Sequence, residues 1–110
     1  YSWAEKGEKL ELAEEYIRKA LAKTPNNGAI IDSLGWVYFK KGDYKEALRL
    51  IEEADKKLPN DPEINMHLGE LWIKLGDRAK ALKYLKKALE LNPRSALKKE
   101  IEDLIKGLSQ

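Results

Sequence analysis

The spacing of apolar residues along the chain predicts a series of amphipathic helices. Apolar side chains recur three or four positions apart, which places them on one face of a helix. The predicted helices span residues 10–23, 29–41, 44–58, 63–75, 78–91 and 95–108. The fold class expected from this pattern is all-α.

Short turns separate these helices, and their residues explain where each helix ends. Gly42 and Gly76 can adopt the left-handed conformation that closes a helix, and the aspartates that follow them can cap the next helix. Pro59 follows the second helix of the first pair directly, and Pro93 follows that of the second pair after Asn92. We therefore expect two helix–turn–helix units joined by proline-containing loops.

The two units repeat each other with a period of 34 residues, since residues 62–95 follow the pattern of residues 28–61. The residues that coincide are Leu34/Leu68, Gly35/Gly69, Gly42/Gly76, Asp43/Asp77, Ala47/Ala81, Leu48/Leu82, Ala54/Ala88 and Pro59/Pro93. A fixed period of about this length, with small residues and a proline in register, indicates a helical solenoid.

Both ends of the chain depart from the repeat. Trp3 precedes Gly7 by four residues, as Tyr38 precedes Gly42, so residues 1–27 are predicted to be a partial repeat with a turn at Gly7. Residues 96–108 carry one apolar stripe without a mid-repeat glycine, and we expect them to form a capping helix. The prediction is a single domain over residues 1–110, with about seven helices including the N-terminal stub.

The residues shared by the two units resemble those of the tetratricopeptide repeat (TPR) family, whose unit is a 34-residue helix–turn–helix. The matching positions are Leu34, Gly35, Tyr38, Ala47, Ala54 and Pro59, then Leu68, Gly69, Trp72, Ala81, Ala88 and Pro93. The family's early tryptophan is replaced by Ile31 and Asn65. The resemblance, which is strongest to bacterial members, implies a right-handed superhelix of antiparallel helix pairs that binds partner proteins.

The resemblance also implies where a partner would bind, because the first helix of each pair lines a concave groove that receives a peptide or helix. The groove-facing residues would be Asp32, Trp36, Phe39, Lys40, Met66, Glu70, Ile73 and Lys74, with Tyr1 and Glu5 at the open end. The apolar members would be anchors and the charged members would set the register. Alternatively, intramolecular packing covers Trp36.

Composition and motifs argue against other classes of function. Lys and Arg number 21 against 19 Asp and Glu, so a net charge of +2 gives no reason to expect a nucleic-acid partner. No apolar run is long enough to span a membrane, and the chain has no cysteine. The single histidine, His67, lacks neighbouring metal ligands, and no catalytic or cofactor-binding motif is present. We therefore expect a protein without catalytic, metal or cofactor sites.

Two smaller expectations concern particular residues. The Lys, Asn and Arg side chains with which some family members clamp a peptide carboxylate are replaced by Ser33, Glu63 and His67. The acidic pairs Glu14-Glu15 and Glu52-Glu53 are expected on solvent-facing sides of their helices.

The sequence is also compatible with a second function. The partial repeat would leave the apolar face of residues 10–21 partly uncovered. That face could pair with a second copy in a homodimer, or with another domain. The alternative function is therefore a structural or assembly module.

Overall fold

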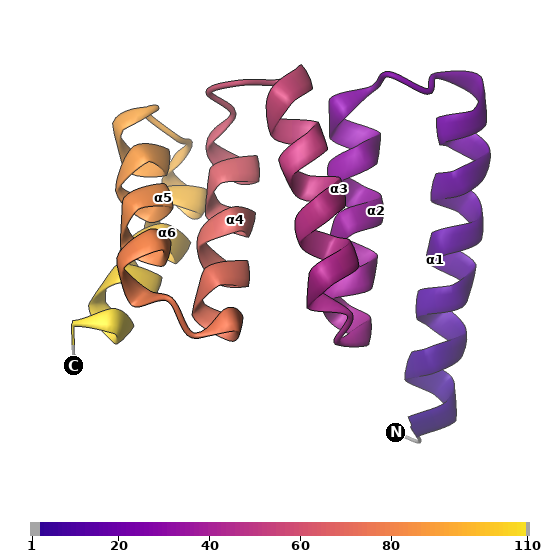
Figure 1. Cartoon of the computed structure of the whole chain (residues 1–110), viewed down its shortest axis with the longest axis horizontal. Coiled ribbons are helices and arrows are strands. Elements are labelled where there is room, and N and C mark those ends of the chain that lie inside the picture. The colour runs from indigo at the N-terminus through magenta and orange to yellow at the C-terminus, as the bar shows by residue number, and fades with distance from the viewer. Residues whose placement is uncertain (1–2, 110) are drawn as a thin grey trace. The chain divides into compact units, whose positions relative to one another are not determined.

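A computed structural model describes the backbone of residues 3–109 and the side chains of residues 9–109. Within this part the chain is all α-helical. Its helices are α1 (Trp3–Lys23), α2 (Gly28–Lys41), α3 (Tyr44–Lys57), α4 (Pro62–Leu75), α5 (Arg78–Glu90) and α6 (Ser95–Leu108) (Figure 1). The chain divides into two compact units, residues 1–57 with α1 to α3 and residues 58–110 with α4 to α6.

The helices end where the turn residues predict. Helices α2 to α5 lie within one residue of the predicted bounds at each end. Gly42 and Gly76 have φ values of 86° and 87°, and their N–H groups donate to Phe39 O and Ile73 O. The carboxylates of Asp43 and Asp77 accept hydrogen bonds from backbone N–H groups three residues later, at 3.2 and 3.0 Å.

The predicted N-terminal turn is wrong, because α1 runs through Gly7 as one continuous helix of 21 residues. The described part therefore contains six helices, where about seven were expected. In the observed turns an aspartate follows the glycine and caps the next helix, whereas Gly7 is followed by Glu8. Glutamate is a poor capping residue, so a helix that contains the glycine is favoured over a break.

In the first unit, α2 and α3 pack closely at Gly35. A Cβ atom at this position would lie 2.5 Å from Cγ1 of Ile51 and 3.3 Å from the carbonyl oxygen of Ala47, so only glycine allows this approach. The buried apolar side chains of this unit are Ile31, Leu34, Val37, Ala47, Leu50, Ile51 and Ala54. They all belong to α2 or α3.

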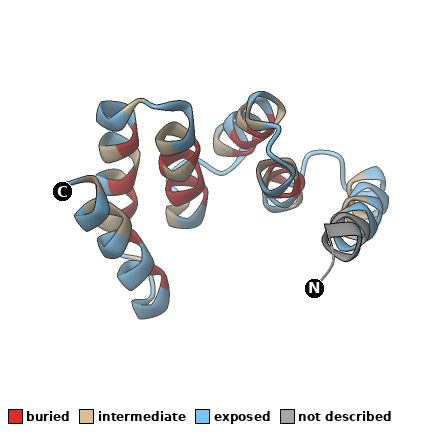
Figure 2. Cartoon of the chain, turned by 90° about the horizontal axis from the view of Figure 1, so that it is seen from below, coloured by how far each residue is buried: buried red, intermediate tan, exposed pale blue. Residues whose placement is uncertain are grey.

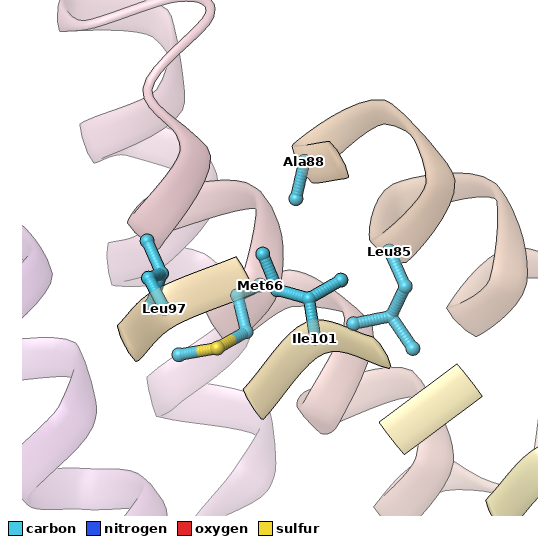
Figure 3. Packing of buried hydrophobic residues seen from close by; sticks show 5 residues of the cluster. All are labelled: Met66, Leu85, Ala88, Leu97 and Ile101. Atoms are coloured by element: carbon cyan, nitrogen blue, oxygen red, sulfur yellow. The ribbon is translucent and has the colours of Figure 1, made fainter. Parts of the chain in front are cut away.

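The second unit repeats this packing and adds α6. Gly69 of α4 meets Leu85 of α5 as Gly35 meets Ile51. Helix α6 packs on α5 and α4, and its Leu97 and Ile101 join Met66, Leu85 and Ala88 in one buried cluster (Figure 3). Burial therefore extends to the last helix of this unit, whereas α1 of the first unit carries no buried residue among those described (Figure 2).

Candidate peptide-binding face

An aromatic pair dominates the predicted binding face of α2. The rings of Trp36 and Phe39 stack with their centroids 4.3 Å apart and their planes 5° from parallel. The ring of Tyr44, at the start of α3, lies 5.5 Å from that of Phe39. All three side chains are partly exposed, so aromatic groups of α2 and of the start of α3 are accessible to solvent.

Charged residues of α2 lie on either side of this pair along the helix. Lys40 is exposed, and its Nζ lies 5.3 Å from the centroid of the Trp36 ring, within the range of a cation–π interaction. Asp32, one turn before Trp36, is buried with 7% of its surface exposed. Of the two charges that were expected to set the register on α2, only Lys40 is therefore accessible.

The corresponding residues of α4 are partly covered by the chain itself. Met66 is 5% exposed and belongs to the cluster with Leu97 and Ile101 of α6 (Figure 3). Ile73 packs against the same cluster. Met66 is therefore a core residue of its unit and is not exposed on the groove-facing side of α4, where the family resemblance placed it. Glu70 is partly exposed and Lys74 is exposed.

A polar network that sequence reasoning missed joins α1 to α2. The Glu14 carboxylate accepts hydrogen bonds from Arg18 Nε at 2.7 Å and from Lys41 Nζ at 2.5 Å. Arg18 Nη2 also donates to the Tyr38 hydroxyl at 2.6 Å, and that hydroxyl lies 3.5 Å from the same carboxylate. Glu14 is thus not a solvent-facing charge, although Glu15 is largely exposed as predicted.

These partners change the acidity of Glu14. The hydrogen bonds from Lys41 and Arg18 favour the ionised carboxylate and lower the pKa of Glu14 from 4.5 to about 2. The hydrogen bond to the Glu14 carboxylate in turn favours the charged guanidinium and raises the pKa of Arg18. Glu14 is therefore charged at any physiological pH and stabilises the docking of α1.

Other surface features give no support for a different kind of site. Two shallow depressions are lined by charged side chains: Glu11, Glu14, Glu15, Arg18 and Lys41 line one, and Arg49, Glu52, Glu53, Lys56 and Lys57 line the other. Across the described residues, no group of three or more His, Cys, Asp or Glu could hold a metal ion. No helix in that part of the chain is long and apolar enough to cross a membrane.

Three further positions were singled out in the sequence. His67 is buried in α4, with 6% of its surface exposed. The side chains of Tyr1 and Glu5, expected at the open end of a groove, lie outside the described residues.

Comparison with solved structures shows that this arrangement of helices is a known one. The Yersinia enterocolitica type III secretion translocator chaperone SycD, in an alternative dimer, matches with a TM-score of 0.83 and 20% identity over 94% of this chain and 82% of that chain. SycD in complex with a peptide of the translocator YopD matches with a TM-score of 0.80 and 18% identity over the same shares. A thermophilic TPR protein of Thermus thermophilus, TTC0263, matches with a TM-score of 0.81 and 26% identity, over 94% of this chain and 54% of that chain.

Sequence comparison gives the family directly. Comparison with curated proteins gives no match. The family model described as tetratricopeptide repeat matches residues 6–65 and again residues 38–99, which together include most of the chain. The observed helix pairs, with Gly35 and Gly69 at their closest approach, agree with that assignment. The chain therefore belongs to the tetratricopeptide repeat family.

Proposed function

We propose that this protein is a non-catalytic scaffold that binds a peptide or helix of a partner protein on the groove-facing side of α2. The observation that carries the proposal is the stacked pair of Trp36 and Phe39, partly exposed and flanked by the exposed Lys40. Stacking holds both rings in place before any partner binds. A preformed aromatic surface loses little side-chain entropy on binding, which is why tryptophan is frequent among the residues that dominate interface energy.

The chemistry of this face suggests the partner. The two rings offer apolar contact area, and the Lys40 ammonium lies over the Trp36 ring, 5.3 Å from its centroid. A matching partner would place an apolar side chain over the rings and a carboxylate near Lys40. An amphipathic helix or an extended segment with an acidic residue beside an apolar one would satisfy both contacts.

Relatives of the same fold support a role in peptide binding. One SycD structure contains a peptide of the translocator YopD, so helices arranged in this way can hold a segment of another protein. The two SycD structures and TTC0263 come from bacteria, which fits the expected bacterial character of the repeats. The low identities mean that the partner of this chain must be found by experiment.

The experiment is a peptide-display selection against the wild-type chain and against Trp36→Ala and Lys40→Ala. Lys80→Ala is the matched control, because Lys80 Nζ also lies over a tryptophan ring, 4.2 Å from the Trp72 centroid in the second unit. We expect apolar peptides with acidic residues to be enriched by the wild type and by Lys80→Ala. Trp36→Ala should lose them, and Lys40→Ala should lose the acidic preference, while circular dichroism remains that of a helical protein.

Two results would count against this function. Either the wild type enriches no peptide, or all four proteins enrich the same peptides. In both cases the aromatic pair is a structural feature of α2 and not a binding surface.

A further inference from the structure

The solvent side of α5 carries three lysines where the matching helix of the first unit, α3, carries charges of both signs. At the 34-residue spacing of the repeat, the matching residues are Arg49/Lys83, Glu52/Lys86 and Glu53/Lys87. Lys83 and Lys86 are exposed and Lys87 is partly exposed. These three lysines are here termed the α5 basic face. The core positions of the two helices do not differ in this way, since Ile51 of α3 and Leu85 of α5 are both 0% exposed.

In α3 the charges on the solvent side attract one another. Arg49 Nε donates to Glu46 Oε1 at 2.7 Å, and Glu52 and Glu53 follow Arg49 by three and four residues. Opposite charges at these spacings stabilise a helix. The hydrogen bond to Glu46 and, to a smaller extent, the charge of Glu53 raise the pKa of Arg49. The charge pattern of α3 therefore has a role within the helix.

In α5 the same spacings bring like charges together. Lys83 precedes Lys86 and Lys87 by three and four residues, at which distance like charges destabilise a helix. None of the three forms an ion pair with a carboxylate among the described residues, whose ion pairs are those of Glu14, Glu15 and Glu46 in α1 to α3. The α5 basic face therefore does not stabilise its own helix.

The helix dipole does not explain these lysines either. Cations are favourable in the last turn of a helix, where α3 has Lys56 and Lys57. Helix α5 has Glu90 at the position of Lys56, and of its three lysines only Lys87 lies in the last turn. Two of the three lysines therefore have no role in helix stability.

We propose that the α5 basic face binds an acidic segment of a partner protein, rich in glutamate or aspartate. The complementary charge of such a segment would remove the repulsion between Lys83 and its two neighbours. A lysine ammonium is a compact charge without the rigid fork of an arginine, so this face would select the density of negative charge more than an exact geometry. The surface is separate from the aromatic pair of α2, and the inference does not depend on the proposed function.

The charge of the whole chain favours a short acidic segment over an extended polyanion. Residues 78–99 contain eight basic side chains and one acidic side chain, which leaves 13 basic and 18 acidic side chains in the rest of the chain. A nucleic acid or an anionic membrane extends beyond α5 and would be repelled by this excess of negative charge. A short peptide can lie along α5 alone.

A second copy of this chain is a poorer occupant of the α5 basic face. Its carboxylates are interleaved with cations, and several are already paired: Glu14 with Arg18 and Lys41, and Glu46 with Arg49. Binding to α5 of another copy would require these carboxylates to give up their present partners. A partner segment with unpaired carboxylates has no such cost.

The test is fluorescence anisotropy with a fluorescein-labelled oligoglutamate peptide, titrated with the full-length chain. The informative variant is the double change Lys86→Glu and Lys87→Glu, which gives α5 the charge pattern that α3 has at Arg49, Glu52 and Glu53. Because that pattern is compatible with the same helix in α3, loss of folding is not expected, and circular dichroism checks it.

The matched control is the double change Lys56→Glu and Lys57→Glu. It alters two adjacent exposed lysines of α3 and changes the net charge by the same amount. Glutamate is tolerated at the first of these positions in a second helix, since α5 has Glu90 there. Labelled oligoglutamine is the control peptide.

We expect the wild type and the α3 control to bind oligoglutamate equally, and the α5 double variant to bind it at least about tenfold more weakly. Added salt should weaken binding by the wild type, and oligoglutamine should not bind. Trp36→Ala and Lys40→Ala should leave oligoglutamate binding unchanged, which separates this surface from that of the proposed function.

The proposal is overturned if the wild type does not bind oligoglutamate, if the α5 double variant binds it equally well, or if the α3 control loses as much affinity. It is also overturned if oligouridylate or phosphatidylserine vesicles bind more tightly than the peptide and require the same two lysines. Sedimentation that shows a dimer abolished by the α5 double variant would replace the partner segment by a second copy.

Discussion

Helix α1 is joined to α2 by a polar network and has no fully buried side chain among those described, whereas α6 inserts apolar side chains into a buried cluster. The polar network consists of Glu14, Arg18, Tyr38 and Lys41. Helix α6 instead inserts Leu97 and Ile101 into a cluster with Met66. Apolar burial contributes more to stability than partly exposed charge pairs do, so the two helices differ in how firmly they are held.

This difference has a functional consequence. Helix α6 covers Met66 and Ile73, which removes part of the predicted binding face of α4. Helix α1 leaves the Trp36 and Phe39 rings of α2 partly exposed. Under the proposed function the first unit carries the recognition surface, and the last helix of the second unit covers the core of that unit.

The largest expected effect on stability comes from truncating an apolar side chain in α6, compared with the same change in α1. Ile101→Ala removes a fully buried side chain and should lower the free energy of unfolding by about 3 kcal/mol. Ile17→Ala, in the partly buried stripe of α1, should cost only about 1 kcal/mol. Chemical denaturation of both variants measures the difference, and equal losses would contradict the comparison.

The second effect concerns the glycines that set the helix spacing. Gly35→Ala places a methyl group against Ile51 and should destabilise the chain by about 1–3 kcal/mol. Gly107→Ala meets no atom within 4 Å and should stabilise α6 by up to about 1 kcal/mol, since alanine favours the helix. Opposite shifts in the thermal midpoint are the expected result, and a stabilising Gly35→Ala would show that α2 and α3 are not packed as described.

The third effect is the dependence of stability on pH. The folded pKa of Glu14 is depressed to about 2, so its contribution is fully present above its unfolded pKa of 4.5 and is lost as the pH falls towards 2. Solvent screening limits that contribution to about 1 kcal/mol. Wild type and Glu14→Gln should therefore differ in the free energy of unfolding at pH 6 and converge at pH 2. A constant difference across this range would exclude Glu14 as the titrating group.

The smallest effect is a response to salt. Salt screens the Glu14 network but not the packing of Leu97 and Ile101, so added sodium chloride should weaken α1 docking by a few tenths of a kcal/mol. Hydrogen exchange resolved by residue should show faster exchange in α1 at high salt, with α6 unchanged. Faster hydrogen exchange in both helices at high salt would mean that α1 and α6 are held by similar forces.

The helices and their turns could be predicted because their determinants are local. Gly42, Asp43 and their counterparts in the second repeat define the helix ends within a few residues of sequence. The sequence pattern predicted a break in α1 because Gly7 has the spacing of a turn glycine. Gly7 is followed by Glu8 and not by a capping residue such as the aspartates after Gly42 and Gly76, and this difference favours a continuous helix. Local pattern therefore gave the fold but not the exact helix count.

The candidate site was harder to predict because its determinants are distant in sequence. Glu14 meets Tyr38 and Lys41, which lie 24 and 27 residues further along, and no local pattern marks these pairs. Met66 was expected on the surface because the amphipathic pattern of α6 does not reveal which apolar residues of α4 it will cover. One usable signal was overlooked: Glu14 stands where the other repeats have Leu48 and Leu82, and a charged residue at an apolar position indicates a polar partner.

Partner binding by the first unit is tested most directly by mapping a display-selected peptide on the wild-type chain by backbone amide chemical-shift perturbation. We predict shifts concentrated in residues 36–44, around the aromatic pair and Lys40, with little change at Met66, Ile73 or the residues of α6. Shifts concentrated in α4 and α6 would contradict it, because they would mean that the partner displaces α6 and binds the second unit.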